Sequence, residues 1–309
     1  PVGRLVFLKN DSLEVVPRLL DNTERDIFDA EKTLQDINQR KVVPSYMVKK
    51  IGLKASLSRN YRVFTSSANV VLSRFFGEKY NTPSIGRKLY LSLKNVSARR
   101  KWESMESGFE KALNEKVILL PLQMQPEGNL DVWGSDYSDQ FALVEMLSDL
   151  FEDELVTILV KPNPKSKYEL SVRLIELIKA RKNLIGIEHR STMKEVLPKV
   201  DMVMSVTGTI IMECVFLGKP VVVFGSHQFS KLPGVYGFSH NQKLCDLKNH
   251  VLYGPYLHAD HSQKLSVLVD VFNNSYDAVL WDPINQPEYN SRSNYVRLSN
   301  AIREVVGER

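Results

Sequence analysis

The chain has 309 residues, which is long enough for two domains of ordinary size, and its content of 43% hydrophobic and 25% charged residues is typical of a soluble globular protein. No apolar run approaches the roughly 18 residues of a membrane-spanning helix, and no charged-then-apolar leader is visible, so a membrane-spanning or secreted protein is not expected. The two cysteines, Cys214 and Cys245, have no metal-ligand spacing and are expected to be reduced thiols.

The net charge of +5 is unevenly distributed along the chain. Residues 1–115 carry 21 Lys and Arg against 13 Asp and Glu, and within 37–101 there are fifteen basic residues against one acid, Glu78. Such a segment attracts nucleic acid, a membrane face or an acidic polymer. A solvated basic helical surface with no partner explains the same composition, and both interpretations stay open.

The first 115 residues predict a smaller, largely helical domain. Arg4–Leu8 has the pattern of a short strand, and Ile27, Ala30, Leu34 and Ile37 form one apolar helical stripe. A second helix is predicted over about 88–114. Because regular strand–helix alternation begins only afterwards, we place the domain boundary near residue 115, between domains 1–115 and 116–309.

Residues 116–309 alternate between short apolar strands and amphipathic helices. This spacing is typical of βαβ units and predicts an α/β fold with a parallel, Rossmann-type sheet covered on both faces. Two further helices are expected at 263–273 and 289–306, and they can pack back on the N-terminal domain. The predicted strands are 117–122, 155–160, 184–188, 202–206 and 220–224, and the predicted helices are 139–151, 168–181, 192–199 and 209–217.

Ligands of open parallel sheets bind beyond the carboxyl ends of the strands, where loop amides and helix N-termini point. Four of the five loops that follow the predicted strands carry hydroxyl, amide, lysine or carboxylate side chains, whereas the strands are plain Val, Ile and Leu. These loops read QMQPEGN at 123–129, KPNPKS at 161–166, SVTGTIIMEC at 205–214 and GSHQFSKLPGVYG at 225–237.

The loop at 205–214 has the residues of an anion-binding helix start. Gly208 allows a ligand to approach the backbone, and the hydroxyls of Ser205, Thr207 and Thr209 can join the free helix amides around a phosphate. Glu213 lies one turn after Thr209, where its carboxylate can reach a ribose diol. Alternatively, Thr209 only caps the helix and Glu213 is a surface acid.

The loop at 161–166 is rigid and polar. Its two prolines fix the backbone, so that Lys161 can pair with a phosphate and Asn163 can offer its amide to a phosphate or a base. A rigid turn with a solvated lysine is the alternative.

These blocks resemble a known family. LPLQMQPEGN, ILVKPNPKS and SVTGTIIMECVFLGKPVVVFGSHQFSKLPGVY are similar, in order and spacing, to successive blocks of the bacterial capsule polysaccharide biosynthesis proteins, which include the Kdo transferases of capsule linkers. The resemblance covers about 115–240. It implies a GT-B fold of two Rossmann-like domains, with a CMP-sugar held mainly by the C-terminal one.

The resemblance also implies roles for individual residues. The block from Lys161 to Pro164 corresponds to a Lys-x-His-Pro motif at the CMP phosphate or base, and Glu213 to the acid at the ribose. Ser205, Thr207 and Thr209, with Gly208, correspond to the phosphate-binding block. Asn163 replaces the motif's histidine, and an asparagine side chain is neither cationic nor able to relay a proton. The complete N-terminal Rossmann domain of a GT-B enzyme is not evident in 1–115.

For catalysis we expect a carboxylate near the reacting sugar. Glu127 is the candidate base or nucleophile, with Gln125 beside it in the Gln-Pro-Glu block, although Glu127 can equally hydrogen-bond a neighbouring loop. His227, after the last predicted strand, is a candidate contact to the donor sugar. The chain has no Asp-x-Asp motif, so we expect neither a metal nor a cofactor.

The sequence therefore predicts a metal-independent glycosyltransferase that uses a CMP-sugar carrying Kdo or a sialic-acid-like sugar. An anionic surface polysaccharide or glycolipid is the expected acceptor, and nucleic acid is not an expected partner. The expected location is the cytoplasm, with peripheral contact to the inner membrane face as an option. A non-hydrolysing UDP-sugar 2-epimerase and a non-catalytic capsule assembly or export protein are the alternatives.

Overall fold

The computed structural model describes residues 5–9, 15–18, 24–39, 85–105, 116–125, 130, 133–163, 169–227, 229–230, 232–280 and 289–307. The chain divides into two compact units: Pro1–Tyr90 with Val267–Arg309, and Leu91–Ser266. The domain boundary expected near residue 115 concerns parts that fold separately, and it stays a prediction. No helix in the described part of the chain is both long and apolar enough to cross a membrane.

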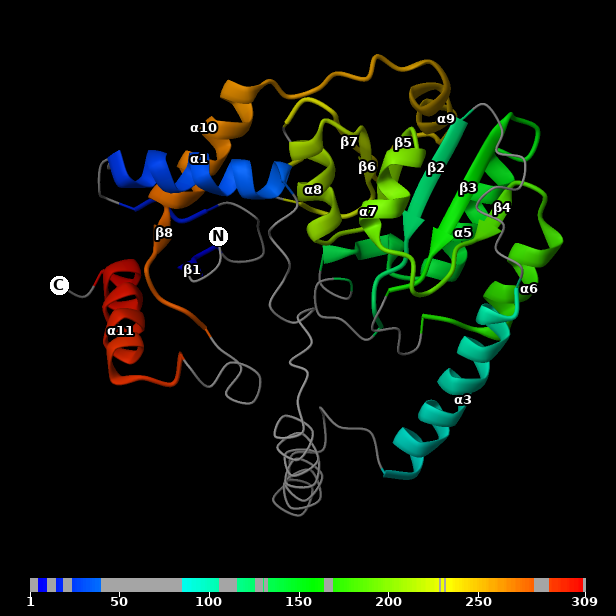
Figure 1. Ribbon diagram of the computed structural model, residues 1–309, viewed down its shortest axis with the longest axis horizontal. Helices are drawn as coiled ribbons and strands as arrows, with labels where there is room; N and C mark the ends of the chain where they lie inside the picture. The colour runs from blue at the N-terminus through cyan, green and yellow to red at the C-terminus, as the bar shows by residue number, and fades with distance from the viewer. Residues whose placement is uncertain are drawn as a thin grey trace. The chain divides into compact units, whose positions relative to one another are not determined.

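A six-stranded parallel sheet forms the centre of the second unit (Figure 1). The strand order is β4-β3-β2-β5-β6-β7. Counted from β2, this is the order 3-2-1-4-5-6 of Rossmann-type folds. The predicted α/β class with a parallel sheet in the C-terminal half is therefore confirmed. The strands are β2 Lys116–Pro121, β3 Val156–Lys161, β4 Leu184–Gly186, β5 Met202–Ser205, β6 Val221–Val223 and β7 Val235–Gly237.

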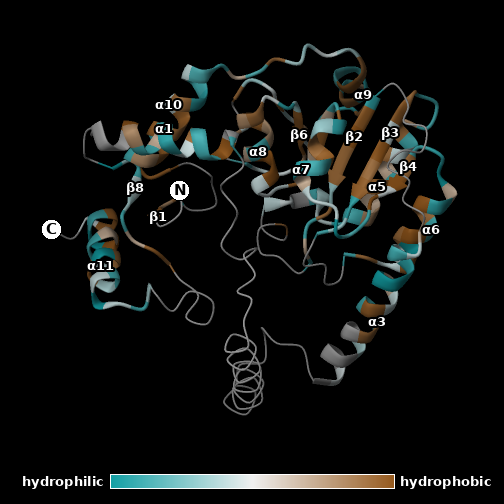
Figure 2. Cartoon of the chain, in the orientation of Figure 1, coloured by the Kyte–Doolittle hydropathy of each residue, from teal (hydrophilic) through white to brown (hydrophobic). Residues whose placement is uncertain are grey.

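Strands β2, β3, β5 and β6 are buried on both faces, which is why they are largely apolar runs, whereas the edge strand β7 is partly exposed. Figure 2 shows β2 and β3 as mainly hydrophobic ribbons. Alternate residues enter two core clusters: Ile158 and Val160 of β3 face one, and Leu159 faces the other. The first cluster packs under α5 Gln140–Leu150, α6 Val172–Ala180 and α9 Leu244–Tyr253, and the second under α7 Met193–Val196 and α8 Thr209–Leu217.

The helices begin at the caps that their sequences provide. The Asp139 carboxylate accepts hydrogen bonds from the first backbone amides of α5, and the Ser171 hydroxyl accepts one at the start of α6. Helix α8 ends at Gly218, whose left-handed backbone (φ 68°) suits glycine. The predicted helix at 168–181 therefore starts later than expected, because Ser171 supplies the cap.

Helix α3 (Ile85–Glu103) joins the core of the sheet through its last turns. Ala98 and Trp102 are buried in the first core cluster, and the Trp102 indole N–H donates a 2.8 Å hydrogen bond to the Ile187 carbonyl beyond β4. This bond fixes the chain directly after β4 against α3. The predicted helix over 88–114 is thus present up to residue 103, and 106–115 lie outside the described residues.

The first unit brings together segments from both ends of the chain. Strand β1 (Leu5–Val6) pairs antiparallel with β8 (Ser275–Tyr276), a sheet that the sequence did not predict. Arg18 stacks on the Tyr276 ring, donates to the Ser275 carbonyl and lies 3.6 Å from Glu304. The described helices of this unit include α1 Glu24–Asn38 and α11 Arg292–Val306, the start of α3 belongs to it, and α10 His261–Asn273 continues into it from the second unit.

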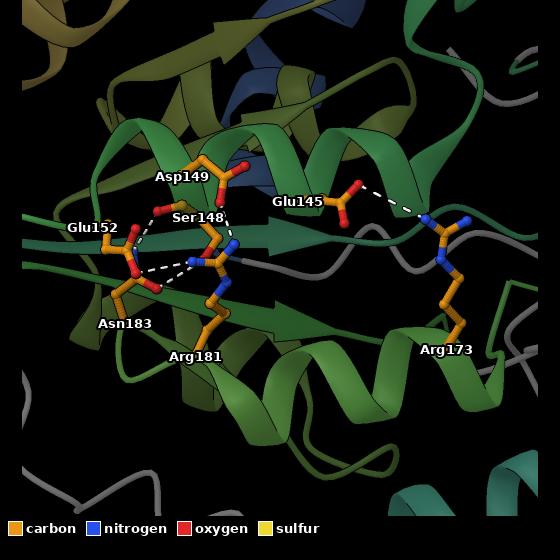
Figure 3. Close-up of polar contacts among 7 residues, drawn as sticks. All are labelled: Glu145, Ser148, Asp149, Glu152, Arg173, Arg181 and Asn183. Carbon is orange, nitrogen blue, oxygen red and sulfur yellow. Dashed lines mark hydrogen bonds and ion pairs between the residues drawn. The ribbon is translucent and has the colours of Figure 1, made fainter.

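A polar cluster joins α5 to the turn before β4, at the amino edge of the sheet (Figure 3). Asn183 is 5% exposed; it accepts a 2.9 Å bond from the Ser148 hydroxyl and donates a 2.8 Å bond to the Ser148 carbonyl. On the exposed side, Arg181 pairs with both Asp149 and Glu152. These groups satisfy one another, so the cluster serves structure.

Replacing Asn183 by alanine is expected to lower the free energy of unfolding by about 1–3 kcal/mol, because the buried Ser148 groups lose both partners. Urea denaturation followed by circular dichroism measures this. Arg181→Ala is the matched control and should cost less than about 1 kcal/mol, since its ion pairs are largely solvated. Equal losses in the two variants would contradict the assignment.

Candidate functional site at the carboxyl edge of the sheet

The strand order reverses between β2 and β5. From β2 the chain first builds β3 and β4 on one side, and it then returns to build β5, β6 and β7 on the other. In open α/β sheets, ligands bind outside the carboxyl ends of the strands at this point, because the flanking connections run to opposite faces. The candidate site therefore lies where Gln123 follows β2 and Thr207 follows β5.

A hydrogen-bonded network connects the two strands at this reversal. The Gln123 side chain donates to the Thr207 carbonyl and accepts a 2.9 Å bond from the Thr207 hydroxyl. The Gln123 backbone exchanges two bonds, of 2.6 and 2.9 Å, with the side chain of Gln140 at the start of α5. All three residues are buried. The loops after β2 and β5 are thereby held together.

Two of the predicted phosphate ligands, Ser205 and Thr207, donate their hydroxyl protons to hydrogen bonds within the protein. Ser205 donates a 2.8 Å bond to the Thr207 carbonyl, and Thr207 donates to Gln123. Neither hydroxyl has a second proton with which to donate to a phosphate. Their role as direct ligands stays a prediction, and in this structure they shape the loop that leads into α8.

The start of α8 presents uncapped backbone. Gly208 adopts φ 104°, and no side chain caps the helix. A Cβ at Gly208 would lie 3.1 Å from the Gln123 amide nitrogen, so this position requires glycine. Thr209 is exposed and Glu213 is half-buried, one turn apart on one face of the helix, as their spacing predicts. The first amides of α8, together with the helix dipole, form an environment that favours an anion.

His227 lies next to this helix start. Its Nδ1 accepts a 3.3 Å bond from the Phe229 amide, which places the ring proton on Nε2. Burial lowers the pKa of His227 to about 4, and the Gly208 backbone opposes this shift. The ring is therefore neutral at pH 7 and acts there as a hydrogen-bond donor. The structure thus brings His227 and Gly208 together.

Lys161 ends β3 and is 1% exposed. Leu159 and Val203 lie two residues before Lys161 and Ser205 on their strands, and both belong to the same core cluster. Lys161 and Ser205 therefore lie on the same face of the sheet. One strand, β2, lies between β3 and β5. The Lys161 ammonium group donates a 3.3 Å bond to the Pro162 carbonyl. Burial lowers the pKa of Lys161 to about 8, and Glu195 opposes the shift.

The remaining predicted residues are only partly described. Gln125 donates a 3.0 Å bond from its side chain to the Ser138 carbonyl, and its backbone amide lies 3.5 Å from Glu169. Asn163 is half-buried directly after β3. Glu127 and Pro164 lie outside the described residues, so their predicted roles stay predictions. Within the described ranges, no three His, Cys, Asp or Glu side chains gather where they could hold a metal ion.

His189 and Arg99 are two polar residues at this edge whose role the sequence pattern did not predict. His189 follows β4 and is 2% exposed, and its Nδ1 lies 3.1 Å from the Arg99 guanidinium on α3. Burial, followed by Arg99 and Lys161, lowers the pKa of His189 to about 4, against an opposing effect of the Asn163 backbone. The loop after the third predicted strand was the one loop for which no site residue was predicted. A histidine directly after a buried strand, as His189 is, could have indicated a site residue there.

The lowered pKa of Lys161 predicts a stability that rises with pH. Between pH 8 and 10.5 the folded chain releases a proton that the unfolded chain retains, so the free energy of unfolding should rise by up to about 3 kcal/mol over this window. Lys161→Met should lack this increment. Urea titrations of both proteins from pH 7 to 10.5 measure it, and parallel curves would contradict the buried, charged state at pH 7.

Gly208→Ala should destabilise the protein by about 1–2 kcal/mol, because alanine disfavours the positive φ and its Cβ crowds Gln123. Gly237→Ala is the control, since a Cβ there meets nothing within 4 Å. Thermal unfolding of the two variants measures the difference, and an unchanged midpoint for Gly208→Ala would refute the requirement for glycine.

Solved structures with similarity to the chain include two transferases and an epimerase. Thermosulfurimonas dismutans KpsC, beta Kdo 2,4 transferase, is 14% identical over 63% of this chain and 57% of its own, with a TM-score of 0.35. The beta Kdo 2,7 transferase of the same KpsC is 17% identical over 73% and 67%, with a TM-score of 0.38. The UDP-GlcNAc 2-epimerase from Methanocaldococcus jannaschii is 15% identical over 58% and 50%, with a TM-score of 0.39.

TM-scores this low do not establish a common fold, and the chain spans only about half to two thirds of each of these structures. A search of curated protein sequences found no significant match. The family model of the capsule polysaccharide biosynthesis proteins, in contrast, matches residues 29–258, which is well over half of the chain. The protein therefore belongs to the capsule polysaccharide biosynthesis protein family.

Proposed function

We propose that this protein is a metal-independent glycosyltransferase of the GT-B type. It transfers Kdo or a sialic-acid-like sugar from a CMP-sugar donor to a surface polysaccharide or glycolipid acceptor. Family membership supports a role in capsule polysaccharide synthesis. The observation that carries the proposal is the uncapped start of α8 at the strand-order reversal, with the neutral His227 beside it.

The chemistry of this site suits the departure of a nucleotide. Cleavage of the bond between sugar and phosphate leaves negative charge on the CMP, and fixed donors stabilise that charge. The amides at the start of α8 and the Lys161 ammonium are such donors, and they need no reorganisation during the reaction. Glu213, on the outward face of α8, is the proposed partner of the ribose.

The acceptor hydroxyl must lose a proton during transfer. Glu127 is the proposed base or nucleophile. Gln125, two residues before it, has its side-chain amide tied to the Ser138 carbonyl, and this bond orients the chain as it enters the loop. Gln125 is therefore proposed to position Glu127, and His227 is proposed to contact the donor sugar.

The basic segment before residue 115 is proposed to meet the anionic acceptor. In this arrangement residues 1–115 form an acceptor-side domain and 116–309 form the donor domain. A peripheral position on the inner face of the cytoplasmic membrane brings the enzyme to a glycolipid acceptor.

Isothermal titration with CMP, UDP and GDP tests the proposal. We expect CMP to bind most tightly, and Lys161→Met to weaken it by about ten- to a hundredfold, since one charge-assisted hydrogen bond is lost. Lys248→Met is the matched control, because Lys248 pairs with Glu154 and takes no part in the site.

The other nucleotides decide between the alternatives. A preference for UDP would support a 2-epimerase-type enzyme, and the absence of binding to any of the three would support a non-catalytic role in capsule assembly. Transfer from CMP-Kdo or CMP-sialic acid to an oligosaccharide acceptor completes the test, and unchanged transfer by Glu127→Gln would remove Glu127 from the mechanism.

A further inference from the structure

A second group of polar side chains lies beyond β3 and β4, beside the candidate nucleotide site. It consists of Lys161 at the end of β3, His189 after β4 and Arg99 on α3. The charges of Arg99 and Lys161 both act on the imidazole of His189. Lys161 and His189 are 1% and 2% exposed, so the protein has buried two titratable groups beyond neighbouring, paired strands.

The proton of His189 can be assigned from its neighbour. A guanidinium group has only donors, so the 3.1 Å contact between Arg99 and Nδ1 requires Nδ1 to accept. Burial and the two nearby cations disfavour a second proton on the ring. The imidazole is therefore neutral, with its hydrogen on Nε2.

Nε2–H is a buried donor that makes no hydrogen bond of normal geometry, although the Asn163 backbone lies close enough to raise the pKa of the ring. The atom is inaccessible to solvent and has no hydrogen-bond partner among the residues that the structure describes. Buried polar groups are nearly always paired, so an unpaired one indicates a missing partner. The partner must be an acceptor, because the group offers only a proton.

No carboxylate takes this place in the described part of the chain. Neither Arg99 nor Lys161 has an acidic group within ion-pair distance there. Glu195 is the nearest acid in electrostatic terms, but it is exposed and its carboxylate accepts the Thr192 amide in a capping box at the start of α7. The side chains of Arg99, Lys161 and His189 thus offer only donors to a ligand, and the acceptors beside them are the backbone groups of Pro162 and Asn163.

We infer that His189 Nε2–H and Lys161 together bind a phosphoryl oxygen, with Arg99 acting as a positioning residue that fixes the histidine tautomer. A tetrahedral oxyanion supplies several acceptors at once and compensates the buried ammonium charge. The identification of this oxyanion as the phosphate of the donor nucleotide rests on the proposed function. The donor-only character of the group does not.

Two substitutions separate the Nε2 donor from the rest of the ring. In His189→Asn the amide oxygen can still accept from Arg99, as Nδ1 does, but nothing replaces Nε2–H. In His189→Gln the longer side chain can place an amide N–H near the Nε2 position. We expect His189→Asn to weaken binding of CMP and of inorganic phosphate by about tenfold or more, and His189→Gln to recover part of the loss.

The experiment titrates the full chain with inorganic phosphate, glycerol phosphate, CMP and uncharged cytidine. Calorimetry gives the affinities, and the ¹⁵N signals of the six histidines report on the ring directly. The His189 Nε2–H resonance should shift on addition of phosphate or CMP and remain in place with cytidine. His250→Asn is the matched control, since His250 stacks on Tyr236 and does not belong to the group. Thermal unfolding of every variant establishes that it is folded.

The outcomes distinguish this inference from the proposed function. Phosphate and glycerol phosphate that bind through His189, without any preference for CMP, would support the oxyanion site and count against a nucleotide donor. CMP that binds equally well to wild type and His189→Asn, with an unmoved His189 signal, would overturn the inference and leave the proposed function standing. Arg99→Met should convert the ring to a mixture of tautomers, and an unchanged Nε2–H signal in that variant would overturn the positioning role.

Discussion

Two neighbouring parallel strands, β2 and β5, carry the constraint on which the rest of this molecule depends. The connections after them run to opposite faces of the sheet, α5 to one and α8 to the other, so their loops need a cross-link if they are to form one surface. The paired hydrogen bonds between Gln123 and Thr207 provide it. A Cβ at residue 208 would lie 3.1 Å from the Gln123 amide nitrogen, and this contact, together with the positive φ, explains why glycine precedes α8. The conformation of the loop between β5 and α8 and the absence of a side-chain cap at Gly208 are therefore related.

Burial turns the polar side chains around this edge into specialised donors. His227 and His189 each accept a hydrogen bond at Nδ1 and are uncharged at neutral pH, so both present Nε2–H. Lys161 keeps its charge in the same water-poor environment at an energetic cost. The polar cluster of Asn183, Ser148 and Arg181 at the opposite edge is different, because its donors and acceptors satisfy each other. An unpaired buried donor at one edge, His189 Nε2–H, and satisfied groups at the other point to the carboxyl edge as the working surface.

The parallel sheet and its covering helices could be predicted from sequence, because strands buried on both faces are unbroken apolar runs and the intervening helices carry clear caps. Strand β7 and helix α9 were not predicted. For β7 the reason is that VYG at 235–237 is too short to show a period, and its place is decided by pairing with β6. The β1–β8 pair joins residues some 270 positions apart, which no local pattern reveals. Among the site residues, the relation of Thr209 to Glu213 follows from helical spacing. The pairing of Thr207 with Gln123, and of His189 with Arg99, depends on how separate elements pack. Only the three-dimensional structure shows that the Ser205 and Thr207 hydroxyls donate to groups within the protein.

The bond from the Trp102 indole to the Ile187 carbonyl has a consequence for dissecting the protein into parts. A fragment beginning at residue 116 contains every strand of the large sheet, so it would be expected to fold independently. It would nevertheless expose the apolar surface that Ala98 and Trp102 cover, and it would separate His189 from its arginine. The shortest piece that preserves the chemistry of the carboxyl edge therefore has to include the last turns of α3.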